Sequence, residues 1–346
     1  MNITFLVGNG FDKACEINTS FSEFCKWYVD QETDSEVIRA FKDAIRKDVA
    51  AKTGFWSDFE IAFGAYSNRI NTLEEFVAIN EDVHDSIIKY LKKESDYYED
   101  NLSPEVDLQS VRSGLANFFH ELNASERRIL TYVCDSSRNP EIVFRFITFN
   151  YTSFIDNCIK TLSEVPLYLS HTVNGIVRRI VDPQVLHVHG LLDLYPILGV
   201  NDESQFLNKE LLKHYGVAES VIKDQSDRIA GEEWLDSATS LIEDSTVICI
   251  YGMSLGASDA YWWKTILTWL QGNANNHLVV FQYLESGKDT TSFYKNATMK
   301  KNLIDSLFAV TRTETSNDEE YRNRIHVIYN TKSVLKVSFE KKKDDI

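Results

Sequence analysis

The chain has 346 residues, of which 43% are hydrophobic and 25% are charged, a composition typical of a folded protein with a sizeable core. Its 52 acidic and 36 basic side chains give a formal net charge of −16, which disfavours a general nucleic-acid binder because such proteins present basic surfaces. The chain contains no run of about 18 apolar residues, so the sequence predicts no membrane span.

The five cysteines are scattered and form no CxxC pair, so the sequence predicts neither a zinc module nor a disulfide framework. Asp12 and Lys13 interrupt the N-terminal apolar run after a few residues, which is not the pattern of a secretory signal peptide. These features predict a cytoplasmic protein, and no metal is expected.

An apolar strand near residues 2–8 leads into the turn Gly8-Asn9-Gly10-Phe11-Asp12. In a parallel α/β sheet this junction lies at the carboxyl edge, where ligands bind. We expect Gly8 to permit the tight turn, Gly10 to let the backbone approach a ligand, and the next helix to point N–H groups at an anion such as pyrophosphate. The full dinucleotide fingerprint needs a third glycine, but Phe11-Asp12-Lys13 follows instead, so a plain strand-to-helix turn is the alternative.

Residues 20–123 contain almost no strand signal and almost no proline. Apolar side chains such as Phe21 and Phe24 recur at helical spacing, and Ser20 with Glu23 has the spacing of a capping box. We therefore predict a helical insertion in which the aromatic residues form a core and the many acidic residues cover solvated faces.

The rest of the chain alternates strands with helices. Predicted strands lie at residues 142–149, 165–169, 185–189, 246–252, 277–283 and 324–329, a hairpin turn lies at Asn174-Gly175, and residues 341–346 form a frayed tail. Such alternation predicts an α/β fold with a doubly wound, mainly parallel, Rossmann-like sheet. Residues 1–19 and 124–340 form this core, and residues 20–123 form the insertion.

Three later strands also end in polar or glycine-rich turns. These turns are Asn150-Tyr151-Thr152, His187-Val188-His189-Gly190 and the segment from Gly252 to Asp259. Because the carboxyl ends of parallel strands meet at one edge, we expect all three to converge with Gly8–Asp12 on one pocket.

These segments, in this order and across nearly the whole chain, resemble the bacterial abortive-infection AbiH family. The resemblance is carried by Leu6-Val7-Gly8-Asn9-Gly10-Phe11-Asp12, Thr148-Phe149-Asn150-Tyr151-Thr152, His187-Val188-His189-Gly190 and Tyr251-Gly252-Met253-Ser254-Leu255-Gly256 with Asp259. It implies a role in defence against bacteriophage, in which an infected cell stops growing or dies. The expected macromolecular partner is a phage-derived trigger or a partner defence protein.

The same segments are more distantly similar to the NAD-binding core of sirtuins and of sirtuin-like NAD-degrading defence proteins. Gly8-Asn9-Gly10-Phe11-Asp12 stands where that family has Gly-Ala-Gly-x-Ser, and His189-Gly190 matches its His-Gly pair. The similarity implies that NAD is the substrate, that Asn150 positions a water or the nicotinamide ribose, and that His189 is the catalytic histidine. The implied NAD-binding residues are Gly8, Asn9, Gly10, Phe11, Asp12, Tyr151, Gly252, Ser254, Leu255 and Asp259.

The chain departs from the sirtuin pattern at two positions. Asp12 replaces a small hydroxyl residue, and a carboxylate beside a pyrophosphate is repelled. Thr152 replaces an aspartate that, in the sirtuin family, holds the nicotinamide amide. The missing CxxC pair also disfavours protein deacylation.

N-glycosidic cleavage suits these side chains. Breaking the nicotinamide–ribose bond passes through an oxocarbenium-like sugar, so the enzyme mainly orients a water and stabilises positive charge. Asn150 can orient the water, and His189 can take its proton. The structural alternatives are a neutral core histidine at position 189 and helix caps at Asn150 and Asp12. A metal site at His187 and His189 lacks a third ligand.

Two other functions stay open at this point. The first is a nucleotide-binding sensor or scaffold that recognises a phage trigger through its acidic helical block and catalyses nothing. The second is a nuclease that binds Mg²⁺ through Asp12 and other carboxylates, although no paired-carboxylate spacing supports it. A small-molecule nucleotide is the expected ligand, neither nucleic acid nor membrane is expected, and a homo-oligomer is compatible with the sequence.

Overall fold

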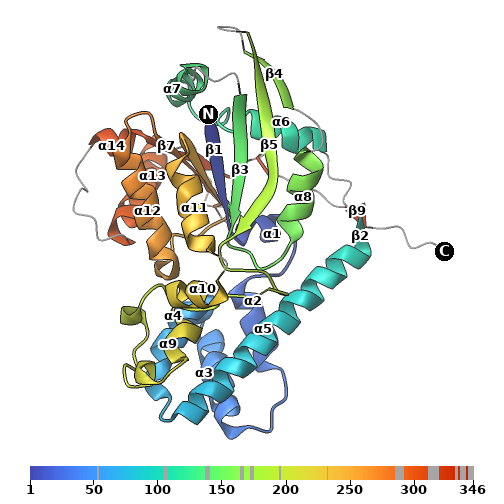
Figure 1. The fold of residues 1–346 in the computed structure, drawn as a ribbon, viewed down its shortest axis with the longest axis vertical. Coiled ribbons are helices and arrows are strands. Elements are labelled where there is room, and N and C mark those ends of the chain that lie inside the picture. The colour runs from blue at the N-terminus through green and yellow to red at the C-terminus, as the bar shows by residue number, and fades with distance from the viewer. Residues whose placement is uncertain are drawn as a thin grey trace, which may run out of the picture.

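The structure is a computed structural model (Figure 1). It describes residues 1–52, 54–103, 108–136, 141–163, 167–171, 175–194, 196–231, 233–284, 292–310, 319–331, 334–335 and 340–341. In this part of the chain, no helix combines the length and the apolar character needed to cross a membrane.

A seven-stranded sheet forms the centre of one half of the molecule (Figure 1). Its strands lie in the order β4 (Leu167–His171), β5 (Gly175–His187), β3 (Glu141–Thr148), β1 (Asn2–Val7), β6 (Val247–Tyr251), β7 (His277–Gln282) and β8 (Ile325–Tyr329). Every neighbouring pair is parallel except β4 and β5, which are antiparallel. The six parallel strands have the Rossmann order, in which strands are added first on one side of β1 and then on the other, so the predicted α/β fold is confirmed.

Helices cover both faces of this sheet, and the central strand β1 is accordingly buried on both of its sides. Ile3, Phe5 and Val7 pack against residues from α6 (Leu108–Ala116), α7 (Ala124–Ser136) and α8 (Phe154–Ser163). On the other face, Leu6 lies in a cluster with residues of α11 (Trp234–Glu243), α12 (Ala260–Gly272) and α13 (Phe293–Val310). A short helix, α14 (Glu319–Asn323), precedes β8.

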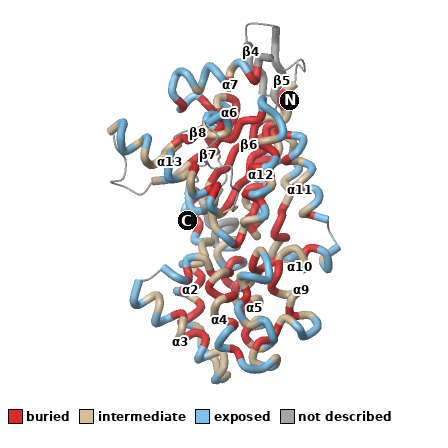
Figure 2. The backbone as a smooth tube through the Cα atoms, turned by 90° about the vertical axis from the view of Figure 1, so that its left-hand side faces the viewer, coloured by how far each residue is buried: buried red, intermediate tan, exposed pale blue. Residues whose placement is uncertain are grey.

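A helical lobe lies below the carboxyl edge of the sheet (Figures 1 and 2). It contains α2 (Phe21–Val29), α3 (Glu36–Ala51), α4 (Phe59–Tyr66) and the long α5 (Leu73–Asn101). The Ser20 side chain caps α2 by accepting from the Glu23 N–H at 3.3 Å, as the capping-box spacing predicts.

The helical lobe has its own apolar core, which is visible as buried segments in the lower half of Figure 2. Phe24, Phe41 and Phe59 are buried there together with Val200 and Val221, which lie far along the chain. The lobe therefore includes the later segment that carries α9 (Val217–Val221) and leads into α10 (Lys223–Ala230).

Some predicted elements have different bounds in the structure. The strands predicted at residues 165–169 and 185–189 belong to β4 and to the single long strand β5, which pair as a hairpin. Residues 172–174, at the predicted hairpin turn, lie outside the described residues. Glu340–Lys341 forms β9 and pairs with β2 (Leu102–Ser103), whereas residues 342–346 of the predicted tail are not described.

Candidate functional site

A cavity of about 1170 Å³ lies where the strand-end turns face the helical lobe. The turns that follow β1, β3, β5 and β6 line one side of it, at the edge where parallel α/β sheets bind ligands. Residues of the helical lobe, among them Phe21, Asp58 and Glu60, line the other side.

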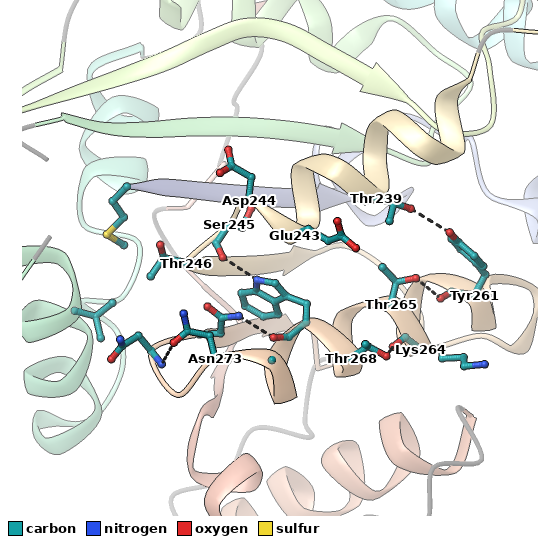
Figure 3. Close-up of a pocket in the computed structure, with 16 residues that line it drawn as sticks. Thr239, Glu243, Asp244, Ser245, Thr246, Tyr261, Lys264, Thr265, Thr268 and Asn273 are labelled. Atoms are coloured by element: carbon teal, nitrogen blue, oxygen red, sulfur yellow. Dashed lines mark hydrogen bonds between the residues drawn. The ribbon is translucent and has the colours of Figure 1, made fainter.

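A second cavity, of about 860 Å³, lies at the opposite edge of the sheet, between the segments before β1, β6 and β7 (Figure 3). The polar side chains around it bond mainly to their own surroundings. Thr239 and Tyr261 hydroxyls are 3.1 Å apart, and Trp269 Nε1 donates to the Ser245 carbonyl at 2.7 Å. None of the residues predicted to form the site lines this cavity, so the carboxyl-edge cavity is the candidate site.

The structure brings most of the predicted residues together around the carboxyl-edge cavity. Those that line it are Gly8, Asn9, Gly10, Asp12, Asn150, Tyr151, His189, Gly252, Ser254 and Asp259. Two predicted residues do not line it. Phe11 is fully buried and packs on Phe154 with ring centroids 6.1 Å apart, and Leu255 packs against the apolar cluster beside α12.

Gly10 in the turn after β1 packs against Gly252 in the turn after β6. A Cβ on Gly10 would lie 2.4 Å from Gly252 Cα, and Gly252 has a φ of +65°. The Gly10 N–H donates to the Gly252 carbonyl at 2.7 Å. The backbone that Gly10 admits is therefore that of Gly252, where a ligand was expected.

The N–H groups of the first turn are also occupied. Gly8 donates to the Tyr251 carbonyl, and Phe11 donates to the Gly8 carbonyl, each at 3.0 Å. The helix that follows, α1 (Gly10–Ala14), has only five residues. The N–H groups of Gly8, Gly10 and Phe11 therefore already have partners and do not form the predicted pyrophosphate cradle.

Asp12 lies at the floor of the cavity and is 1% exposed. Its carboxylate accepts hydrogen bonds from Thr19 Oγ1 at 2.8 Å, Asn150 Nδ2 at 2.9 Å and Thr152 Oγ1 at 3.2 Å. Burial raises the pKa of Asp12 to about 6, although these hydrogen bonds favour the ionised form. Asp12 is therefore a carboxylate held by neutral donors and close to changing its protonation state at neutral pH.

Asn150 has one used and one unused polar atom. Because an ionised carboxylate only accepts hydrogen bonds, the Asn150 amide nitrogen must face Asp12. Asn150 Oδ1 is buried and has no hydrogen-bond partner among the described residues. Leaving such an acceptor unsatisfied costs about 1–3 kcal/mol, so this atom is suited to accept a bond from a water or a ligand.

His187 supports Asn150 from behind. Its Nδ1 lies 3.0 Å from the Asn150 carbonyl oxygen, and its Nε2 lies 2.9 Å from Asp156 Oδ2. His187 does not line the cavity. Within the described ranges, no group of three His, Cys, Asp or Glu side chains is arranged to hold a metal ion.

His189 lies between two aromatic rings, with centroid distances of 5.2 Å to Phe149 and 6.1 Å to Tyr151. Its Nε2 is 3.4 Å from Asp259 Oδ1, an ion-pair distance that is longer than a good hydrogen bond. Burial lowers the pKa of His189, and the nearby Lys223 lowers it further. The imidazole is therefore neutral at physiological pH and able to accept a proton.

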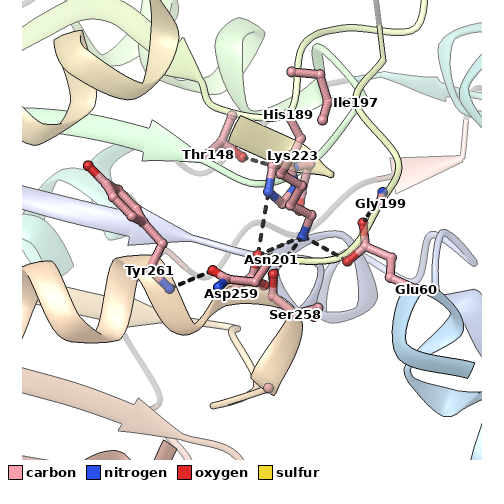
Figure 4. A network of polar contacts seen from close by, with 12 residues as sticks. Glu60, Thr148, His189, Ile197, Gly199, Asn201, Lys223, Ser258, Asp259 and Tyr261 are labelled. Atoms are coloured by element: carbon pink, nitrogen blue, oxygen red, sulfur yellow. Dashed lines mark hydrogen bonds and ion pairs between the residues drawn. The ribbon is translucent and has the colours of Figure 1, made fainter. Parts of the chain in front are cut away.

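A buried ion network lies next to His189 (Figure 4). Lys223 Nζ is 2.7 Å from Glu60 Oε2 and 2.9 Å from Asp259 Oδ1. Glu60, Lys223 and Asp58 are not among the site residues predicted from the sequence. The one available signal was Glu60 itself, because it is the only charged residue in the otherwise apolar helix α4.

One comparison with known proteins gives a match. The family model described as "Bacteriophage abortive infection AbiH" matches residues 4–283, well over half of the chain. The matched region contains all four strand-end turns and the helices of the helical lobe. Comparison with curated proteins gives no match.

Proposed function

This chain belongs to the bacteriophage abortive infection AbiH family, and we propose that it acts in phage defence as an NAD⁺ hydrolase. The reaction is cleavage of the nicotinamide–ribose bond. The observation that carries the proposal is the buried carboxylate of Asp12, which orients Asn150 at the floor of a cavity that His189 also lines. A role in phage abortive infection follows from the family itself.

The residues take separate roles in this reaction. Asn150 Oδ1 accepts a hydrogen bond from the attacking water or from a ribose hydroxyl, because Asp12 holds the amide in that orientation. The water oxygen bonds to the anomeric carbon, and the electron pair of the breaking C–N bond goes to nicotinamide. Neutral His189 takes the proton that the water loses. The negative charge of Asp12 favours the cationic sugar of the transition state.

The two departures from the sirtuin pattern are linked in space. Asp12 and Thr152 are hydrogen-bonded to each other at 3.2 Å. In the sirtuin pattern, the carboxylate follows the third strand and the hydroxyl stands in the first turn. Both groups are present here, with their positions exchanged. This pairing supports an N-glycosidic site built on the same two turns.

The size of the cavity and the hydroxyl groups that line it also support NAD⁺ as the ligand. The cavity volume of about 1170 Å³ is at the upper end of small-molecule pockets and is large enough to hold a dinucleotide. Ser20, Ser22 and Ser254 line it, and their hydroxyl groups can donate to phosphate oxygens. These hydroxyls take the role that the first-turn N–H groups were expected to have.

The direct test is to incubate the purified full-length protein with NAD⁺ and to follow nicotinamide release by chromatography. We expect release by the wild-type protein and a loss of about 10²–10⁴-fold in His189→Ala. Glu210→Gln, which removes an exposed carboxylate that does not line the cavity, should leave the rate unchanged. If the wild-type protein neither binds nor consumes NAD⁺, and His189→Ala still protects cells from phage, the enzymatic proposal is wrong and the sensor alternative stands.

A further inference from the structure

Lys223 forms the centre of a fully satisfied, buried ion network. Besides its contacts with Glu60 and Asp259, its ammonium group donates to the Ser258 carbonyl at 3.1 Å. These three acceptors use all three hydrogens of the ammonium group. Burial disfavours the charge of Lys223, but the two carboxylates hold its pKa above the ordinary value.

The partners of Lys223 come from both halves of the molecule (Figure 4). Glu60 lies on α4 in the helical lobe, is 4% exposed, and also accepts from the Gly199 N–H at 3.1 Å. Asp259 ends η5 (Ala257–Asp259), which follows β6 of the sheet. Lys223 therefore ties the helical lobe to one of the turns that line the candidate site.

Two neutral contacts strengthen the same connection. Gln205 Nε2 donates to the Ala257 carbonyl at 2.8 Å, and the Tyr261 N–H donates to Asn201 Oδ1 at 2.7 Å. The segment of the helical lobe between residues 199 and 223 is thus bonded to the turn around Asp259 at several points. The position of Asp259 depends on that lobe.

Asp259 Oδ1 is shared between Lys223 and His189, at 2.9 and 3.4 Å. Burial would raise the pKa of Asp259, yet Lys223 and His189 hold it well below its ordinary value, so Asp259 remains ionised. The charged groups that face His189 are Asp259 and Lys223, with Glu60 and Asp58 behind Lys223 and the Tyr151 ring at its side. Burial raises the pKa of Glu60, whereas the ammonium group of Lys223 at 2.7 Å favours its ionised form, so Glu60 and Lys223 act as one pair beside Asp259.

We infer that Glu60 and Lys223 are positioning residues that make the helical lobe part of the candidate active site, by setting how closely Asp259 pairs with His189. Glu60 draws the ammonium group of Lys223 toward the lobe. The carboxylate of Asp259 thereby keeps part of its attraction for the imidazole. The inference rests on the proposed function only for its activity readout.

The test compares the pH titration of His189 by NMR in four proteins, the wild type and three variants, with ring-labelled histidine and the His189 resonance identified by its absence in His189→Gln. In Glu60→Gln, Lys223 pairs with Asp259 alone, so the midpoint should fall by roughly half a pH unit. In the double variant Glu60→Gln/Lys223→Met, Asp259 faces His189 without a cation, so the midpoint should rise by roughly one pH unit. Glu210→Gln removes a carboxylate from an exposed lysine pair and should leave it unchanged.

Shifts in opposite directions support the inference, since a merely structural contact gives no change of sign. Equal midpoints in all four proteins, or shifts in the same direction, would overturn it. A wild-type protein that releases no nicotinamide but shows the opposite shifts fails the proposed function and keeps this inference. If the wild-type protein releases nicotinamide but the His189 midpoints do not move in the variants, the proposed function is supported and this inference fails.

Discussion

Two aspartates line the same cavity in contrasting surroundings. Asp12 is bonded by three neutral donors, and burial raises its pKa to about 6. Asp259 is paired with Lys223 at 2.9 Å, and its pKa is held well below the ordinary value. Environments that separate two titrating groups in this way assign them different roles. Asp12 can change its protonation state near neutral pH, whereas Asp259 is a fixed charge.

The contrast also concerns stability. An ionised Asp12 opposes folding at neutral pH, because the cost of its burial exceeds what its hydrogen bonds and the nearby His187 offset. Lys223 neutralises the buried charge of Asp259, so breaking this ion network is expected to destabilise the fold strongly. The buried charge that lowers stability thus belongs to Asp12, at the proposed reacting centre, as expected where function limits stability.

The largest effect, on the rate of nicotinamide release, is expected when Asn150, the amide donor to Asp12, is replaced. Asn150→Ala should lower the rate of nicotinamide release by about 10²–10⁴-fold, because the water or ribose hydroxyl loses its oriented acceptor. The fold should persist, which circular dichroism can check. A variant with wild-type turnover would exclude Asn150 from the reaction.

Breaking the network of Asp259 should have a large effect on stability. Lys223→Met leaves Glu60 and Asp259 as two buried carboxylates without a cation, which should lower the free energy of unfolding by about 3–5 kcal/mol. Urea unfolding measures this change. Adding Glu60→Gln should restore part of the loss, and the exposed pair control Glu210→Gln should change it by no more than about 0.5 kcal/mol. Equal effects of Lys223→Met and the control would contradict the assigned role.

Replacing Asp12 should instead raise the free energy of unfolding at neutral pH. The folded-state pKa of Asp12 lies above its ordinary value of 3.8, so its contribution to stability is complete below pH 3.8 and is lost as the pH rises through about 6. Asp12→Asn lacks this titration and should be more stable than wild type by about 3 kcal/mol at pH 7.5. The difference should shrink toward zero below pH 4. Unfolding curves at both pH values check this, and a less stable variant at pH 7.5 would refute it.

The smallest of these effects concerns the glycine contact that brings the two turns together. Gly10→Ala places a Cβ 2.4 Å from Gly252 Cα, so the turns must separate, at a cost of about 1–3 kcal/mol. Gly272→Ala at the end of α12 is the matched control, because its Cβ meets no atom within 4 Å. Thermal unfolding of both variants measures the difference. A Gly10→Ala protein as stable as the control would contradict the close packing.

The sequence predicts the convergence of the turns because the rule for parallel strand ends is geometric. Gly8, Asn150, His189 and Gly252 each follow an apolar strand, and all four line one cavity. The partners of Asp12 could be anticipated only in part, since the bonds from Asn150 and Thr152, 138 and 140 residues away, depend on how the turn after β3 is oriented. The contact between Gly10 and Gly252 has no signal in the sequence.

The ion network could not be predicted for a related reason. Glu60 and Lys223 are 163 residues apart and meet only because two separate stretches form the helical lobe. A lone charge in an apolar helix predicts a buried partner but not its identity. The N–H groups of Gly8 and Gly10 are occupied by carbonyls of the turn after β6, whose position the sequence does not give, so the sequence could not show that they are unavailable to a pyrophosphate.

The most direct test of this contrast is a ¹³C NMR titration of the Asp12 and Asp259 carboxyl carbons in the wild-type protein, with assignments from Asp12→Asn and Asp259→Asn. The expected result is an Asp12 midpoint near pH 6 and an Asp259 signal that stays ionised down to the lowest pH at which the protein is folded. An Asp12 midpoint below pH 4, or a titration of Asp259 near neutral pH, would contradict the division of roles between the two aspartates.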